Sequence, residues 1–173
     1  ESYDMFASNG ILFNHESPLR GEHFVTRKIS MHVANYSHGY KKPLELGNLS
    51  AKRDWGFAGD YVSGMWMMLQ HDKPMDFVLA TGENHSVREF VEIAFNQIGV
   101  GIDWEGENEN EIGRNSSSGE IIVTVNSDFF RPAEVQNLLG DYTKAKTLLG
   151  WEPKLSFTDL VESMVSADVQ RLG

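Results

Sequence analysis

Short apolar runs alternate with amphipathic helical patterns along this chain, and this alternation restricts the fold more than any other feature. Segments 10–14 and 77–80 are short continuous apolar runs, as expected of parallel strands buried on both faces. Between them, Val25, Ile29 and Val33 recur at helical spacing. Strands and helices that alternate in this way predict an α/β protein.

Capping signals give the boundaries of several helices. Ser86 and Glu89 form a capping box, followed by an apolar face and a stop at Gly99. Gly150 closes a short helix, and Ser156 begins the last one. The other segments are expected as follows: residues 1–8 as the end of a helix, 44–48 and 120–125 as strands, 105–119 as a polar surface loop, and 143–149 as the short helix.

One further helix is predicted from its apolar periodicity. Asp60 is expected to cap it, and Val62, Met65, Trp66 and Leu69 follow at i, i+3, i+4 and i+7 spacing. This face, with the methionines around it, is interpreted as buried core rather than as a cofactor site.

Charge and composition exclude several classes of function. The 173 residues carry a formal net charge of -10, which argues against a nucleic-acid-binding surface, because phosphate backbones are bound through basic residues. The chain has no cysteine, and its six histidines lack metal-ligand spacing, so no metal site is expected. No apolar run approaches the ~20 residues of a membrane span. The first residues also lack a signal-peptide pattern, so we expect a cytoplasmic protein without a membrane partner.

Several segments together resemble one enzyme family. The chain has no strand followed by a glycine-rich phosphate turn, so it holds no complete dinucleotide fold of its own. The characteristic segments are residues 9–18 (NGILFNHESP), 46–49 (LGNL), 51–56 (AKRDWG), 80–83 (ATGE) and 131–135 (RPAEV). They resemble the GDP-mannose 4,6-dehydratases, members of the extended short-chain dehydrogenase/reductase group, and the likeness covers nearly the whole chain.

The resemblance implies an architecture and an activity. Residues 1–173 would be a single C-terminal, sugar-nucleotide-binding part of an extended Rossmann-type enzyme, with the remaining sheet strands and a mixed α/β substrate-binding domain. The family's glycine-rich NADP loop, its catalytic Thr and Glu and its Tyr-x-x-x-Lys pair would all precede Glu1. No residue of this chain is therefore assigned a catalytic role. The complete enzyme would be a lyase that converts GDP-mannose to GDP-4-keto-6-deoxymannose and uses NADP as its cofactor. It would be a homo-oligomer.

The resemblance also assigns binding residues. The expected substrate contacts are Asn14, Val25, Lys28, Leu46, Asn48, Arg53, Arg131 and Glu134, and the expected NADP contacts are His15 and Arg20. Arg53 and Arg131 would hold the diphosphate, for which the planar guanidinium fork is suited. Glu134 would accept hydrogen bonds from the ribose hydroxyls. Asn14 would orient a hexose hydroxyl. The guanine pocket would be lined by Val25, Lys28, Leu46 and Asn48.

The residues alone leave other interpretations open. Arg53 beside Asp54 could be a simple ion pair, Lys28 a solvated lysine and Val25 a core residue. A non-catalytic sugar-nucleotide-binding or regulatory fragment, a related nucleotide-sugar dehydratase or epimerase, and a globular interaction domain without a ligand all remain alternatives.

Overall fold

The computed structural model describes residues 3, 5–130 and 137–173, and the chain forms two compact units. Unit 1 comprises Glu1–Ser17, Arg53–Asn84 and Leu138–Leu160, and unit 2 comprises Pro18–Lys52, His85–Asn137 and Val161–Gly173. Among the described residues, no helix combines the length and apolarity that crossing a bilayer requires.

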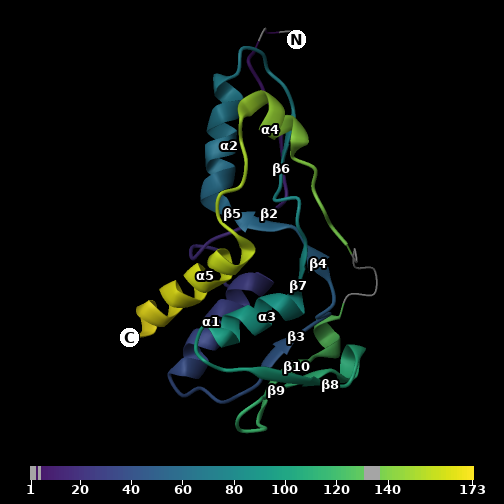
Figure 1. Ribbon diagram of the computed structural model, residues 1–173, viewed down its shortest axis with the longest axis vertical. Coiled ribbons are helices and arrows are strands. Elements are labelled where there is room, and N and C mark those ends of the chain that lie inside the picture. The colour runs from purple at the N-terminus through teal and green to yellow at the C-terminus, as the bar shows by residue number, and fades with distance from the viewer. Residues whose placement is uncertain (1–2, 4, 131–136) are drawn as a thin grey trace. The chain divides into compact units, whose positions relative to one another are not determined.

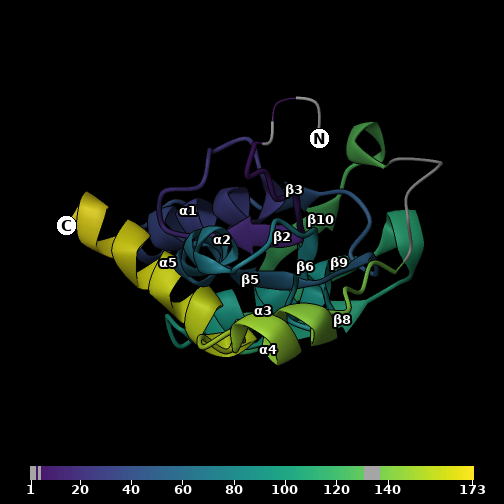
Figure 2. The ribbon, with the colours of Figure 1, turned by 90° about the horizontal axis from the view of Figure 1, so that it is seen from above.

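Unit 1 is built from two pairs of parallel strands and two helices. Its elements are β1 (Gly10–Leu12), β2 (Asn14–Glu16), β5 (Trp55–Phe57), α2 (Ala58–Gln70), β6 (Phe77–Leu79) and α4 (Thr143–Leu149). Strand β1 pairs with β6, and β2 pairs with β5. Figures 1 and 2 both show α2 beside β2 and β5. The predicted short helix is confirmed, and it ends at Gly150 with a φ of 68°.

The core of unit 1 is aromatic and aliphatic. It contains Tyr61, Met68, Phe77, Leu79, Ala145 and Trp151, all buried. The Trp151 indole donates to the Asp60 carbonyl at 2.8 Å, so its one polar atom is satisfied within the core. The Asp60 carboxylate accepts from the backbone N–H groups of Lys154 at 2.9 Å and Leu155 at 3.2 Å. Helix α2 begins at Ala58, so the prediction that Asp60 caps this helix is wrong. Asp60 instead fixes the segment before the last helix.

The predicted buried face of α2 is also wrong. The helix buries Tyr61, Gly64 and Met68, whereas the predicted stripe is exposed: Val62 by 62%, Met65 by 38%, Trp66 by 63% and Leu69 by 57%. The periodicity marks an apolar face, but no described element covers it. Strand β1 also exposes an apolar side chain, since Ile11 is 57% exposed. The prediction that this strand is buried on both faces is therefore wrong.

Unit 2 contains a four-stranded sheet and helices. Its elements are α1 (Val25–Ser37), β3 (Leu44–Leu46), β7 (His85–Ser86), α3 (Val87–Asn96), β8 (Ile102–Glu105), the 3-10 turns η1 (Asn108–Asn110) and η2 (Ser127–Phe129), β9 (Ile112–Asn115) and β10 (Ile121–Val125). The sheet order is β3-β10-β9-β8. Strands β3 and β10 are parallel, and the other two pairs are antiparallel. Two further elements, β4 (Lys52–Arg53) and α5 (Phe157–Leu172), have residues in both units.

Helices α1 and α3 lie side by side next to this sheet (Figure 1). The capping box of α3 is confirmed: the Ser86 hydroxyl accepts from the Glu89 N–H, and the Glu89 carboxylate accepts from the Ser86 N–H. Its predicted face is buried at Phe90, Val91 and Phe95. The start of α5 near Ser156 is confirmed as well, since the Ser156 hydroxyl accepts from the Asp159 N–H at 3.1 Å. The fully buried residues that α5 contributes are those the sequence predicted, Leu160, Val161, Met164 and Val165.

Two segments differ from their predictions. Residues 105–119 are not a surface loop, because Ile112–Asn115 forms β9 and pairs with strands on both sides. Residues 3 and 5–8, the described part of the expected first helix, are not helical.

The exposed stripe on α2 predicts that the chain associates with itself through this helix. Replacing Trp66 and Leu69 by Gln, which keeps helix propensity and removes apolar surface, should shift the chain towards monomer in sedimentation velocity experiments. Leu172→Gln, a change at an exposed leucine of α5, is the matched control and should change nothing. A wild-type chain that stays monomeric over the whole concentration series would contradict this prediction.

Candidate functional site

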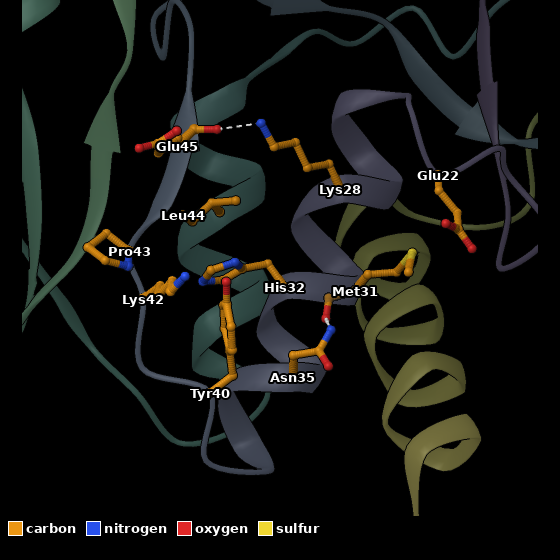
Figure 3. Close-up of a pocket in the computed structure, with 10 residues that line it drawn as sticks. All are labelled: Glu22, Lys28, Met31, His32, Asn35, Tyr40, Lys42, Pro43, Leu44 and Glu45. Carbon is orange, nitrogen blue, oxygen red and sulfur yellow. Dashed lines mark hydrogen bonds between the residues drawn. The ribbon is translucent and has the colours of Figure 1, made fainter.

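A pocket of about 660 Å³ opens beside α1 in unit 2. Helix α1 contributes Lys28, Met31, His32 and Asn35 to its lining, and residues 40 and 42–45 line the facing side (Figure 3). Its floor includes Leu44, which is buried in β3. Of the residues predicted from the sequence, Lys28 is in this lining.

The Lys28 ammonium is held at one side of the pocket. Its Nζ donates to the Glu45 carbonyl at 2.7 Å (Figure 3). The same Nζ lies 4.1 Å from the centre of the Phe129 ring. Burial lowers the pKa of Lys28 from its usual value, and the Glu45 carboxylate acts in the opposite direction. A partly desolvated ammonium has three donors, and the Glu45 carbonyl takes one of them. Lys28 is therefore oriented by protein contacts and can still donate to an oxygen of a ligand.

His32 is a pocket residue that the sequence did not indicate. It lies one helical turn after Lys28, and its ring meets Tyr40 edge-on at 5.7 Å. Among the described residues, its buried Nε2 has no hydrogen-bond partner. Burial, and secondly the charge of Lys28, lower the pKa of His32 from 6.5 to about 4. A neutral imidazole therefore lines the pocket near pH 7. The i, i+4 spacing from Lys28 was the one signal that could have identified it.

The other residues predicted for the guanine pocket are Val25, Leu46 and Asn48, and each has a different environment. Val25 is the first residue of α1 and is partly exposed. Leu46 is buried at the end of β3, and its carbonyl accepts from the Asn126 N–H at 2.8 Å. Asn48 follows in the turn, where its side-chain oxygen accepts from the Ser50 N–H at 2.9 Å. The structure thus places Lys28 in the pocket lining, with Leu46 and Asn48 on the strand and turn that follow Glu45.

Arg20 belongs to the loop that precedes α1. Its guanidinium lies 3.4 Å from the centre of the Phe24 ring, a cation–π contact that holds the side chain along the loop. Arg131 and Glu134, the predicted diphosphate and ribose contacts, lie outside the described residues.

Asn14 and His15 are both in β2 of unit 1. His15 donates from Nδ1 to the Phe13 carbonyl at 2.8 Å, which leaves Nε2 as the acceptor of the neutral ring. Its ring stacks on Tyr61 with centroids 5.2 Å apart. Burial, followed by the charges of Asp54 and Asp60, raises the pKa of Tyr61 well above its usual value. The orientation of His15 is therefore set by a carbonyl and an aromatic ring.

Arg53 precedes the most constrained carboxylate of unit 1. Asp54 is fully buried and accepts from the Thr81 N–H at 2.8 Å, the Thr81 hydroxyl at 2.7 Å, the Gly82 N–H at 3.0 Å and the Gly140 N–H at 3.1 Å. This carboxylate ties the backbone next to Arg53 to two distant segments. The sequence interpretation of Asp54 as an ion-pair partner of Arg53 missed this role, which depends on contacts 27 to 86 residues apart.

Asp54→Asn should destabilise unit 1 strongly. The amide loses the negative charge and turns an NH2 group towards N–H donors, so at least two charge-assisted hydrogen bonds are lost, at ~1.5–3 kcal/mol each. We expect the free energy of unfolding to fall by about 3 kcal/mol or more in urea titrations. The control Asp72→Asn removes an exposed carboxylate of the same unit. Equal stability of the two variants would remove Asp54 from this role.

The low pKa of His32 predicts a pH-dependent stability. The unfolded imidazole binds a proton near pH 6.5 and the folded one only near pH 4, so this contribution is complete above pH 6.5 and is lost as the pH falls towards 4. Between pH 7 and pH 5 the chain should lose about 2 kcal/mol from this group. His32→Gln should flatten this part of the stability curve in denaturant titrations, whereas His38→Gln, at an exposed position, should not. Parallel curves for wild type and His32→Gln would contradict the assignment.

Comparison with solved structures defines the class of fold. RMD from Pseudomonas aeruginosa, complexed with NADPH, matches with a TM-score of 0.75 at 19% identity, covering 94% of this chain and 48% of that one. dTDP-glucose 4,6-dehydratase from Bacillus anthracis, in complex with NAD, matches with a TM-score of 0.69 at 17% identity, covering 91% and 43%. The fold is that of the extended Rossmann-type nucleotide-sugar epimerases and dehydratases, and the predicted fold class is confirmed.

Sequence comparison is more specific. The family model for GDP-mannose 4,6 dehydratase matches residues 1–164. GDP-mannose 4,6 dehydratase from Homo sapiens is 59% identical over 170 residues, which are 98% of this chain and 46% of the relative. The chain therefore belongs to the GDP-mannose 4,6 dehydratase family, as its sequence motifs indicated. It spans about half the length of the curated relatives that it matches.

Proposed function

We propose that this chain is the GDP-sugar-binding part of a lyase that converts GDP-mannose to GDP-4-keto-6-deoxymannose, the precursor of GDP-fucose and related deoxysugars. The observation that carries the proposal is the family match over residues 1–164. The catalytic groups would come from the part of the relatives that this chain does not span. The complete enzyme would act as a homo-oligomer.

The pocket beside α1 supports a role in binding the guanine. Guanine presents an O6 acceptor next to its N1 and N2 donors, and a site that reads it must offer a donor beside acceptors. Lys28 supplies an oriented donor. Backbone carbonyls of the strand and turn that follow Glu45 would supply acceptors: Asn48 through its carbonyl, and Leu46 through the lone pair that its bond with the Asn126 N–H leaves. Val25 would add apolar contact from the first turn of α1.

The arginines support a role in binding the diphosphate. Arg53 can present the bidentate guanidinium fork that suits phosphate oxygens. Asp54, with its four donors in unit 1, holds the backbone that carries Arg53. We assign Arg131 a second phosphate contact, Glu134 the ribose hydroxyls and Asn14 a hexose hydroxyl, all on the basis of family resemblance.

Two residues of this chain, His15 and Arg20, have groups that could contact a nicotinamide dinucleotide. His15 keeps Nε2 available as an acceptor, since Nδ1 donates to the Phe13 carbonyl. Arg20 supplies a cation suited to a phosphate, and we assign it to NADP on the basis of family resemblance. NADP, when bound, would accept a hydride from the hexose and return it after loss of water. This chain's residues would hold and orient the cofactor.

Nucleotide choice tests the proposal. In the complete enzyme that contains this chain, GDP should bind at least about tenfold more tightly than UDP or dTDP, because a pyrimidine leaves buried pocket groups unpaired at ~1–3 kcal/mol each. Lys28→Met should reduce this preference in competition calorimetry, and Lys41→Met, outside the pocket lining, should not. Equal affinities for the three nucleotides would move the chain to another branch of the nucleotide-sugar enzymes.

A further inference from the structure

Helix α1 begins without a side-chain cap. Phe24 occupies the N-cap position and makes no side-chain hydrogen bond, and the first turn contains no acidic residue. A side-chain cap or a first-turn carboxylate would otherwise help to fix this end of the helix. The position of α1 relative to the loop 18–24 must therefore depend on other contacts.

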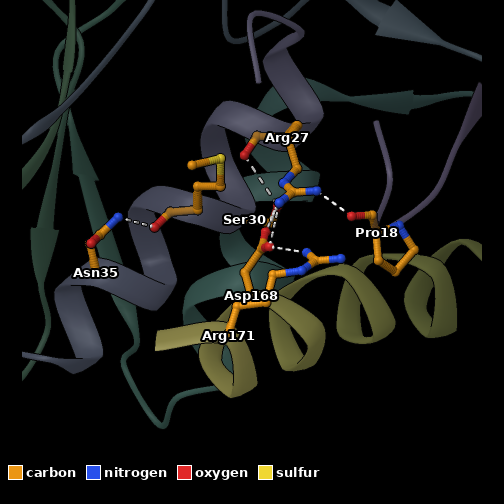
Figure 4. Close-up of polar contacts among 7 residues, drawn as sticks. Pro18, Arg27, Ser30, Asn35, Asp168 and Arg171 are labelled. Carbon is orange, nitrogen blue, oxygen red and sulfur yellow. Dashed lines mark hydrogen bonds and ion pairs between the residues drawn. The ribbon is translucent and has the colours of Figure 1, made fainter. Parts of the chain in front are cut away.

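Arg27, in the first turn of α1, makes those contacts. Its side chain is almost fully buried, with Nη1 donating to the Pro18 carbonyl and Nη2 paired with the Asp168 carboxylate at 2.8 Å (Figure 4). One guanidinium thus joins the start of the loop to the helix that follows it and to α5.

Asp168 holds Arg27 in place. This carboxylate is 3% exposed and also accepts from the Ser30 hydroxyl at 2.7 Å and from Arg171 at 2.6 Å (Figure 4). Ser30 lies one turn after Arg27 on α1, so two residues of α1 are bonded to the same carboxylate of α5. A buried carboxylate with these partners leaves the guanidinium little freedom to turn away from Pro18.

The loop between Pro18 and Arg27 is braced internally. The Phe24 N–H donates to the Gly21 carbonyl at 3.1 Å, and Arg20 packs on the Phe24 ring. A loop tied at Pro18 and braced at Phe24 moves with α1 rather than independently of it. The position of Arg20 therefore follows from the Arg27 contacts.

We propose that Arg27 is a positioning residue for nucleotide binding: its contacts with Pro18 and Asp168 hold the loop 18–24, and with it Arg20, in register with the first turn of α1, which carries Val25 and Lys28. The inference rests on the proposed function for what Arg20 and Lys28 bind. The geometric part, that Arg27 orders the loop, is independent of it.

Variants can separate positioning from stability. Arg27→Lys keeps a charge for Asp168, but one ammonium cannot reproduce the two directions of the guanidinium fork. The double variant Arg27→Met with Asp168→Leu removes both charges together, which is often neutral for stability, yet it leaves the Pro18 carbonyl without its donor. Arg171→Ala is the matched control, because it removes an exposed partner of the same carboxylate.

Two measurements on these variants test the proposal. In the 173-residue chain, amide hydrogen exchange in residues 18–24 should accelerate about tenfold in Arg27→Lys and in the double variant, the factor for one lost hydrogen bond, and should not change in Arg171→Ala. In the complete enzyme, the Kd for NADP should rise about tenfold in the same two variants, while the Tm of the double variant stays near that of wild type.

The two measurements test separate parts of the proposal, the ordering of the loop and the effect on NADP binding. Unchanged loop exchange in a folded double variant would overturn the positioning role of Arg27. Faster exchange with an unchanged Kd for NADP would overturn its link to binding. A wild-type enzyme that binds no NADP would count against the proposed function instead, and the exchange data would still decide whether Arg27 orders the loop.

Discussion

The buried carboxylate of Asp54 is the constraint on which unit 1 depends. A fully buried charge is tolerated only when donors surround it, and Thr81, Gly82 and Gly140 provide them from two segments that are distant in the sequence. Gly140 can approach because it has no side chain: a Cβ there would lie 2.2 Å from the Cβ of Ala80. The strand ends of unit 1 are therefore set by polar contacts, and the apolar core packs around them.

Unit 2 uses a buried ion pair for a similar purpose. Arg27 and Asp168 connect α1 with α5, and Lys28 and His32 project from the same helix α1 into the pocket. A buried pair of this kind adds little net stability compared with apolar residues of the same size, but it specifies one arrangement. Pocket residues on α1 are thus placed by a contact that lies outside the pocket.

Features that depend on local chemistry could be predicted from the sequence. The capping box at Ser86 and the glycine stop at Gly150 involve residues within one turn, and both are confirmed. The polarity of residues 105–119 predicts a loop and hides strand β9, which is stabilised by its neighbours in the sheet. The apolar spacing of the α2 stripe was recognised, but spacing cannot show whether another element covers a face.

The candidate site also contains residues that the sequence could indicate and residues that it could not. Lys28 was identified through motif resemblance, and the structure adds its contacts with Glu45 and Phe129. His32 and Arg27 were missed, because their roles arise from burial and from partners such as Asp168 that are remote in sequence.

Each unit is assembled from three separate segments of the chain, and the last of these are Leu138–Leu160 in unit 1 and Val161–Gly173 in unit 2. During synthesis on the ribosome, neither unit can finish packing until its last segment emerges, so both nascent cores would need protection from aggregation at the same time.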